Sequence, residues 1–313
     1  MLRLGIDLGG TNIAAGLVNE KGVIVNKKSI PTHAQRNPGF IIDDIVELCN
    51  SVCLDYASWD DVESVGIAVP GGVDVNSGMI FFTPNIPFTG LNISKILSDR
   101  LNGKKVLVIN DANAALQAEL VFGCATDSKN VVMITIGTGV GGGIAIDRHI
   151  LNGINGMAAE LGHMVIKKDG KACSCGRHGC FEAYASATAL IELTKNEIDR
   201  CKRNDEYSLM MDAKEIDARV AFDAYKLGDP YAEKVITEYI ESLASGVISL
   251  INIFQPELFV IGGGVSGEKQ FLLDLLMPYV NKEQYSRSID KNTRLATALC
   301  GNDAGIIGAA FAE

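Results

Sequence analysis

The sequence contains one short pattern twice, and this repetition limits the folds that the chain can adopt. Residues 2–17 read as an apolar strand, a glycine-rich turn and a returning strand, and residues 130–146 repeat that layout. The first turn is Asp-Leu-Gly-Gly-Thr-Asn at positions 7–12, and the second is Gly-Thr-Gly at positions 137–139. Two such hairpins, about 130 residues apart, predict a duplicated α/β domain. We expect a nucleotide to bind in the cleft between the two copies.

The chemistry of these turns suits phosphate. Exposed backbone N–H groups, with a threonine hydroxyl beside them, form a concave anion site. Asp7 stands at the end of the first strand, where its carboxylate could hold Mg²⁺ or the water bound to it. A single Gly-Gly turn is more often an ordinary hairpin tip, but the repetition favours phosphate binding. A third glycine run at 262–264 follows the apolar strand 258–261, and bare backbone there could lie flat against a base or ribose.

A cluster of cysteines predicts a metal site. Cys173, Cys175 and Cys180 fall within eight residues, and His163 precedes the first of them by ten positions. Three thiolates and one imidazole are the ligand set of a closed tetrahedral zinc site. His178 is a competing ligand, and the other interpretations are a disulfide and a chance cluster of small buried residues. The remaining five cysteines are scattered singly, which is typical of a reducing compartment, where clustered thiols hold metal more often than they pair.

Two carboxylates, Glu160 and Glu182, bracket the predicted zinc site. A zinc ion held by three thiolates and an imidazole has no position left for a carboxylate. Both acids are therefore free to bind something else, and ionised carboxylates accept hydrogen bonds from hydroxyl groups.

Further binding groups are predicted in the first third of the chain. Asp111 follows the apolar strand 106–109 and opens a helix, where a carboxylate is either an N-cap or a catalytic group at the end of a strand. Gly71 follows the buried strand 62–69 and brings bare backbone to a ligand. Asn85 lies on a loop stiffened by two prolines and is either a hydroxyl-binding group or a turn former.

Composition excludes several classes of function. The 313 residues allow two domains of ordinary size. The net charge of −10 argues against binding to nucleic acid or to an anionic membrane, because neutralising phosphates needs clustered Lys and Arg. The chain has no apolar run of about 20 residues and no signal-peptide pattern, so we expect a soluble, cytoplasmic protein.

The periodicity of the other segments predicts their secondary structure. Strands are expected over residues 23–30 and 295–299. Helices are expected over residues 40–56, 182–201, from 213 onward, 230–254 and 302–312, the last packing on the N-terminal lobe.

Taken together, these motifs resemble those of the ROK family of sugar kinases (repressors, open reading frames, kinases). The resemblance extends over nearly the whole chain, and its zinc signature is among the most specific in the sugar kinases. The motifs follow in family order at residues 7–12, 110–111, 136–139, 160–163, 173–182 and 261–264.

The resemblance implies a bilobal actin-like ATPase fold of the hexokinase type, which is ribonuclease H-like, built from duplicated α/β domains. The small lobe would comprise residues 1–115 and 300–313, and the large lobe residues 116–299 with the zinc knuckle. The implied activity is MgATP-dependent transfer of the γ-phosphate to a hexose, and the implied assembly is a homodimer.

The resemblance also assigns residue roles. Asp111 matches the general base of the family, and the zinc is structural. The positions that match sugar-binding residues are Asn85, Asn110, Glu160, His163 and Glu182, with His163 serving both sugar and zinc, and we add Gly71 and Asp111 to the expected sugar-binding set. The positions that match the phosphate loops are Asp7, Gly9, Gly10, Thr11, Asn12, Gly137, Thr138 and Gly139, and those that match the adenosine loop are Gly262, Gly263 and Gly264.

The sequence departs from many glucokinases of the family near the sugar site. Residues 87–90 are Pro-Phe-Thr-Gly, where those enzymes carry a Gly-Trp pair, and this is closer to the allose-kinase branch. We expect the 6-hydroxyl of glucose as acceptor, with allose or an N-acetylhexosamine (GlcNAc or ManNAc) as alternatives. A sugar-responsive regulator without catalysis is a further alternative. The intact Asp111 and glycine turns count against it, as does the start of the first motif at position 7, which leaves no room for a helix-turn-helix.

Overall fold

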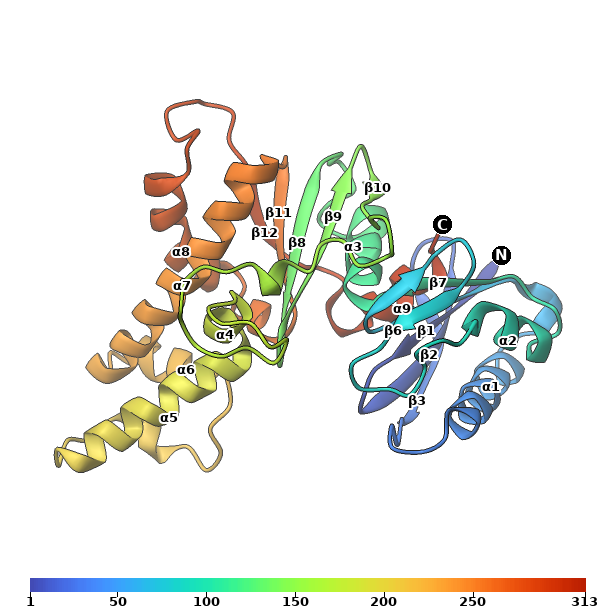
Figure 1. The fold of residues 1–313 in the computed structure, drawn as a ribbon, viewed down its shortest axis with the longest axis horizontal. Helices are drawn as coiled ribbons and strands as arrows, with labels where there is room; N and C mark the ends of the chain where they lie inside the picture. The colour runs from blue at the N-terminus through green and yellow to red at the C-terminus, as the bar shows by residue number, and fades with distance from the viewer. The chain divides into compact units, whose positions relative to one another are not determined.

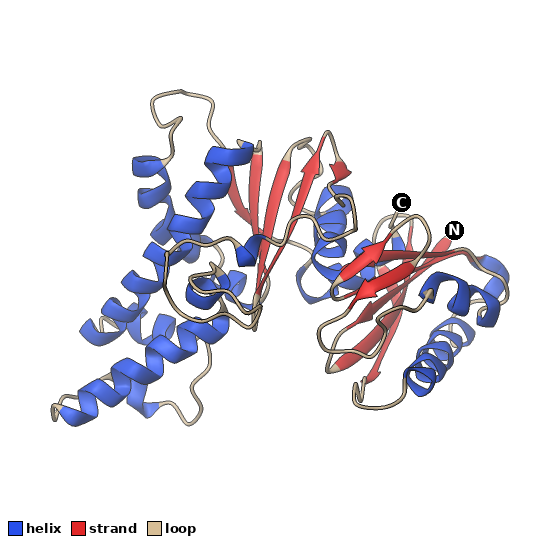
Figure 2. Cartoon of the chain, viewed as in Figure 1, coloured by secondary structure: helices blue, strands red, loops and turns tan.

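A computed structural model describes all residues from 1 to 313. Two five-stranded sheets, each with helices packed beside it, account for most of the chain (Figure 2). The chain divides into two compact units. Unit 1 comprises residues 1–130, 143–159 and 298–313, and unit 2 comprises residues 131–142 and 160–297. The predicted lobes, 1–115 with 300–313 and 116–299, stay a prediction.

The two sheets have the same strand order, which confirms the predicted duplication. The first has the order β3-β2-β1-β4-β7 and the second the order β10-β9-β8-β11-β12. In the first, β1 pairs antiparallel with β2 and parallel with β4; in the second, β8 pairs parallel with β11. The strands are β1 (Leu2–Leu8), β2 (Asn12–Asn19), β3 (Ile24–Pro31), β4 (Val62–Val69), β7 (Val106–Asn110), β8 (Val131–Ile136), β9 (Val140–Ile146), β10 (His149–Ile150), β11 (Leu258–Gly262) and β12 (Arg294–Thr297).

The helices and a small hairpin complete the fold. Unit 1 contains α1 (Pro38–Leu54), α2 (Ile93–Arg100), α3 (Asp111–Phe122), α9 (Ala304–Ala310) and the hairpin of β5 (Gly72–Asp74) and β6 (Met79–Phe82). Unit 2 contains α4 (Glu182–Ala185), α5 (Ala187–Arg203), α6 (Val220–Lys226), α7 (Pro230–Phe254) and α8 (Gln270–Glu283). Short 3₁₀ helices are η1 (Trp59–Asp61), η2 (Leu161–His163), η3 (Leu209–Asp212), η4 (Gly264–Glu268) and η5 (Gly301–Asp303).

Successive residues along the strands of unit 1 face opposite sides of the sheet, with large apolar side chains toward α1 and glycines toward α9. Leu4 and Ile6 of β1 are fully buried in the core that includes α1. The residue between them, Gly5, faces α9, and a Cβ there would overlap the carbonyl oxygen of Ile306. Gly66 of β4 is as close to the backbone of α9. Because these positions lack side chains, the C-terminal helix lies directly on the sheet, as predicted (Figure 1).

Two helix predictions are wrong in their boundaries. The helix expected from residue 213 begins only at Val220, because Ala213 is extended and the side chain of Asp217 accepts a hydrogen bond from the N–H of Arg219. The helix expected over 182–201 is broken at Ser186, whose extended backbone ends α4. Its hydroxyl oxygen then caps α5.

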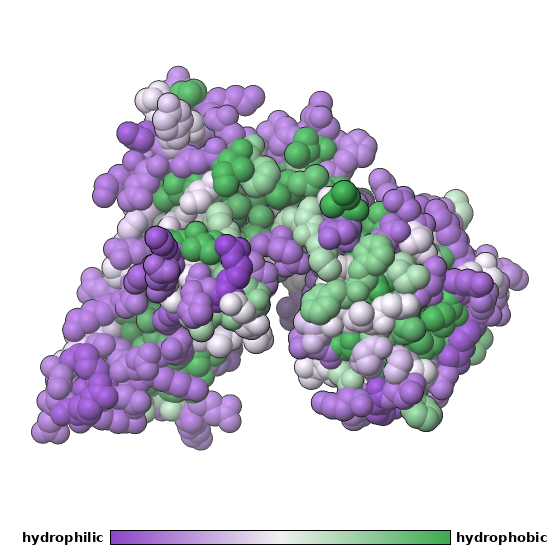
Figure 3. Space-filling model, in the orientation of Figure 1, coloured by the Kyte–Doolittle hydropathy of each residue, from purple (hydrophilic) through white to green (hydrophobic).

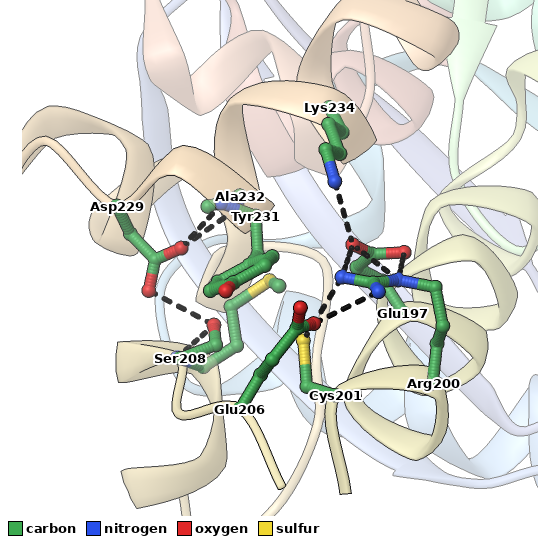
Figure 4. Close-up of polar contacts among 10 residues, drawn as sticks. Glu197, Arg200, Cys201, Glu206, Ser208, Asp229, Tyr231, Ala232 and Lys234 are labelled. Carbon is green, nitrogen blue, oxygen red and sulfur yellow. Dashed lines mark hydrogen bonds and ion pairs between the residues drawn. The ribbon is translucent and has the colours of Figure 1, made fainter. Parts of the chain in front are cut away.

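The long helix α7 begins where the sequence predicts it. Asp229 is its N-cap, and one carboxylate oxygen accepts hydrogen bonds from the N–H groups of Tyr231 and Ala232 at 2.8 and 2.9 Å. The other oxygen accepts from the hydroxyl of Ser208 at 2.9 Å (Figure 4). It also accepts from the N–H of Leu209. A single buried carboxylate therefore ties the loop before η3 to the start of α7.

The outer end of α5 is hydrophilic (Figure 3). An ion-paired Arg200 on this helix bridges Glu197 and Glu206. The exposed residues of α5 in this region are Glu192, Lys195, Asn196, Asp199, Lys202 and Arg203.

No helix of the chain combines the length and the apolar character that crossing a membrane would require.

Candidate active site

The first glycine turn joins β1 to β2 and is held through its carbonyl groups. The N–H of Gly9 donates to the carbonyl of Asn12 at 2.9 Å. Thr32, directly after β3, donates its hydroxyl to the carbonyl of Gly9 at 2.7 Å and its N–H to the carbonyl of Thr11 at 2.8 Å. The N–H groups of Gly10 and Thr11 have no hydrogen-bond partner in the chain. They are available to an anion, as the turn chemistry predicts.

Asp7 lies at the end of β1, on the side that faces α9. A Cβ at position 305 would overlap its carboxyl group, so Gly305 is what allows the helix to cover Asp7. Burial raises the pKa of Asp7 above its ordinary value, and the charge of Lys27 opposes that shift. A bound cation would favour the ionised form, so this carboxylate fits the predicted Mg²⁺ role.

The second glycine turn joins β8 to β9 and is held in a similar way within unit 2. The N–H of Gly137 donates to the carbonyl of Gly139 at 2.9 Å. Ala187 donates its N–H to the carbonyl of Gly137 at 2.9 Å, and Thr188 donates its hydroxyl to the carbonyl of Thr138 at 2.7 Å. The N–H groups of Thr138 and Gly139 have no partner in the chain. This turn therefore also presents donors for phosphate.

The helix cap that the sequence suggests for Asp111 is supplied by its neighbour. Asn110 is the N-cap of α3 and accepts hydrogen bonds from the N–H groups of Ala112 and Asn113 at 2.9 and 3.1 Å. Asp111 is instead the first helical residue, with an exposed side chain. The cap interpretation of Asp111 is therefore wrong, because Asn110 has the extended backbone that a cap requires.

Asn110 also reaches a second predicted residue. Its side-chain N–H donates to the carbonyl of Gly71 at 3.0 Å. Gly71 has a φ of 101°, and a Cβ there would overlap the carbonyl of Phe82, so only glycine fits. Elsewhere in unit 1, Asn85 lies beside the first turn, where a Cβ on Gly10 would stand 3.4 Å from that of Asn85.

The four predicted metal ligands lie together. The ligand atoms of His163, Cys173, Cys175 and Cys180 are all within 4.8 Å of one another. Nδ1 of His163 is 3.6 Å from Sγ of Cys173, and the sulfurs of Cys175 and Cys180 are 3.7 Å apart. A disulfide needs about 2.05 Å, whereas sulfurs bound to one tetrahedral zinc stand about 3.8 Å apart. The geometry fits a metal, and His178 is not part of the cluster.

The two carboxylates beside this cluster have different surroundings. Glu160 makes no hydrogen bond through its side chain, and partial burial raises its pKa, with His163 lowering it and Glu182 raising it. Glu182 accepts from the N–H of Val140 at 3.0 Å and from the hydroxyl of Ser174 at 3.3 Å. Glu160 is thus available to a ligand, whereas Glu182 links the metal cluster to the second turn.

The third glycine run ends β11 and lies beside the second turn. Gly263 has a φ of 81°, and a Cβ there would overlap the backbone of Ile136, the last residue of β8. Gly262 is buried, and Gly264 begins η4. Close approach of bare backbone is the feature expected of an adenosine-binding loop.

A sequence profile described as the ROK family matches residues 3–312. The chain belongs to the ROK family. Among its ROK relatives, a glucokinase from Thermotoga maritima is 34% identical over 308 residues, covering 98% of this chain and 95% of the relative. A xylose repressor from Bacillus spizizenii is 27% identical over 307 residues, covering 97% of this chain and 75% of the repressor.

A solved ROK structure supports the fold assignment. The Streptomyces griseus glucokinase in complex with glucose and AMPPNP has a TM-score of 0.84 and 33% identity, covering 99% of this chain and 98% of that one. Together with the repeated strand order, this similarity confirms the predicted actin-like ATPase fold of the ROK sugar kinases.

Proposed function

We propose that this ROK protein is an ATP-dependent glucokinase that transfers the γ-phosphate of ATP to the 6-hydroxyl of glucose. The observation that carries the proposal is the similarity to glucokinases over nearly the full length of both chains. The two glycine turns with unpaired N–H groups and the exposed Asp111 supply the groups that this chemistry needs.

Phosphoryl transfer depends on positioning and on neutralising the charge of the phosphates. The N–H groups of Gly10, Thr11, Thr138 and Gly139 would bind phosphate oxygens. A sugar hydroxyl has a high pKa and is a poor nucleophile, so a carboxylate within hydrogen-bond reach accelerates the reaction by accepting its proton. We assign that role to Asp111, whose position at the start of α3 is fixed by the Asn110 cap.

The sugar would be held by hydrogen-bond acceptors and donors. Glu160, whose side chain makes no hydrogen bond, is suited to accept hydrogen bonds from sugar hydroxyls. Asn85, Asn110 and the backbone of Gly71 are the proposed sugar-binding groups of unit 1. His163 and Glu182 stay in the proposed sugar set, although both oxygens of Glu182 already accept hydrogen bonds.

Two metals belong to the proposal. Mg²⁺, when bound, neutralises the triphosphate, and Asp7 is the residue that would hold it or its waters. Zinc, when bound to His163, Cys173, Cys175 and Cys180, fixes the loop between Glu160 and Glu182 and leaves no position for a reacting water. Homodimer assembly also stays part of the proposal.

A hexose panel tests the activity. Release of ADP is measured in a coupled assay with MgATP and each of glucose, allose, mannose, GlcNAc and ManNAc. We expect glucose to give the highest kcat/KM. A higher kcat/KM with allose or an N-acetylhexosamine would contradict the proposed acceptor, and no ADP release with any sugar would favour a regulator, the function named for the xylose repressor relative.

A further inference from the structure

A threonine outside each glycine turn donates its hydroxyl to one carbonyl oxygen of that turn. We propose that Thr32 and Thr188 are positioning residues for the phosphates of the nucleotide, each fixing one peptide of a turn so that the free N–H group of Gly10 or of Gly139 faces the ligand. Neither residue belongs to the repeated motif, and neither would touch the nucleotide in this role. The assignment rests on the proposed function, because the turns must bind phosphate for their orientation to matter.

The geometry of the peptide bond connects each carbonyl to the next N–H. In a trans peptide, the C=O of one residue and the N–H of the following residue point in opposite directions. The chain contains no cis peptide bond. A hydrogen bond that fixes the carbonyl of Gly9 therefore also fixes the direction of the N–H of Gly10. By the same rule, the bonded carbonyls of Gly137 and Thr138 fix the N–H groups of Thr138 and Gly139.

In each turn, the N–H group that the threonine hydroxyl fixes is one without a partner. In the first turn, Thr32 donates to the carbonyl of Gly9 at 2.7 Å, and the N–H of Gly10 is unpaired. In the second turn, Thr188 donates to the carbonyl of Thr138 at 2.7 Å, and the N–H of Gly139 is unpaired. Each hydroxyl thus binds the C=O of a peptide group whose N–H, pointing the opposite way, has no partner.

Glycine-rich turns need such an external restraint. Glycine loses more backbone freedom on ordering than any other residue, and a ligand that must order a mobile loop binds more weakly. The two restraints come from unrelated elements. Thr32 is fully buried directly after β3, and Thr188 is an exposed residue in the first turn of α5. The same arrangement therefore arises twice from different parts of the chain.

Valine and serine substitutions test the proposal. Thr32→Val and Thr188→Val keep the shape of the side chain and remove the hydroxyl, whereas Thr32→Ser and Thr188→Ser keep it. A matched control is Thr194→Val, because Thr194 lies on α5 and donates to the carbonyl of Leu190 at 2.8 Å without contacting a glycine turn. For every variant we would measure KM for ATP, KM for glucose and the Kd of MgADP by calorimetry.

The valine variants should weaken nucleotide binding selectively. We expect KM for ATP and Kd for MgADP to rise about three- to tenfold, which is the usual effect of losing one hydrogen bond. KM for glucose should stay within about twofold, and the serine variants and Thr194→Val should bind MgADP like the wild type. A general loss of stability would not raise KM for ATP while leaving KM for glucose nearly unchanged.

Three outcomes would overturn the proposal. They are unchanged MgADP affinity in Thr188→Val, an equal loss in Thr194→Val, and no recovery in Thr188→Ser. Because Thr188 is exposed, it decides the matter even if the buried Thr32→Val fails to fold. A wild type that binds MgADP but phosphorylates no hexose would contradict the proposed function, and the MgADP affinities of the variants would still decide the role of the threonines.

Discussion

Among the four clustered metal ligands, Cys175 is the exposed one, so its substitution disturbs the packing least. We predict that the purified chain carries about one zinc ion and that Cys175→Ser loses most of it, because serine is a poor zinc ligand. Cys300→Ser, outside the cluster, should keep the zinc. Elemental analysis after dialysis measures the content, and a wild type without zinc, or a Cys175→Ser variant with full zinc, would contradict the assignment.

At the scale of single residues, the sequence predicts which side chains gather at a site better than it predicts the structural role of each one. The clustering of the metal ligands follows from cysteine spacing, because the intervening chain is short. The cap of α3 could not be assigned from sequence, because Asn110 and Asp111 are both capping residue types and only the backbone angles distinguish them. Thr32 and Thr188 were missed because they lie 23 and 50 positions from the carbonyls they bind, and no local pattern connects them.

At the scale of elements, Asp229 and α7 lead to a prediction about pH. Burial raises the pKa of Asp229, but hydrogen bonds from Ala232, Leu209, Ser208 and Tyr231 outweigh this and lower it overall. A lowered pKa in the folded state means that this carboxylate stabilises the fold above its unfolded pKa of about 3.9, and that the stabilisation is lost as pH falls through the folded pKa.

Asp229→Asn should therefore destabilise the protein at pH 7 and much less at low pH. Asparagine can still cap α7 with its carbonyl oxygen, but its NH₂ group cannot accept from Ser208 and Leu209. We expect a loss of about 1–3 kcal/mol at pH 7 that shrinks below about pH 4, measured by urea unfolding. Asp199→Asn, an exposed change on α5, is the control. An Asp229→Asn difference that stays constant with pH would contradict the account.

Helices with clear start and end residues are the ones that the sequence predicts well. The Asp-Pro start and the apolar period of α7 define it from sequence alone. The helices α2 and α8 are absent from the predicted set. The first has only two buried residues, Ile93 and Leu97, and so a weak periodic signal. The second has apolar residues at helical spacing but contains Pro278, a residue that normally predicts the end of a helix.

At the scale of the whole molecule, the duplication was visible in the sequence because each copy keeps its strand–turn–strand motif. The common strand order of the two sheets agrees with it. The residues that make up each compact unit are harder to predict, because each unit is assembled from separate segments of the chain. The acceptor sugar depends on the shape of a pocket at single-atom detail, which motif spacing does not encode.

The central claim is that Asp111 removes the proton from the sugar hydroxyl while phosphate is transferred. Asp111→Asn keeps the size of the side chain and an oxygen for the hydrogen bond with the N–H of Ala112, which is 2.9 Å long in the native chain. The most direct measurement is the kcat of this variant with glucose and MgATP, beside the Kd of glucose by calorimetry. We predict a kcat reduced by about 10²–10⁴ with a glucose Kd within about threefold of the wild type. A variant that binds glucose normally and turns over at a rate near that of the wild type would contradict the claim.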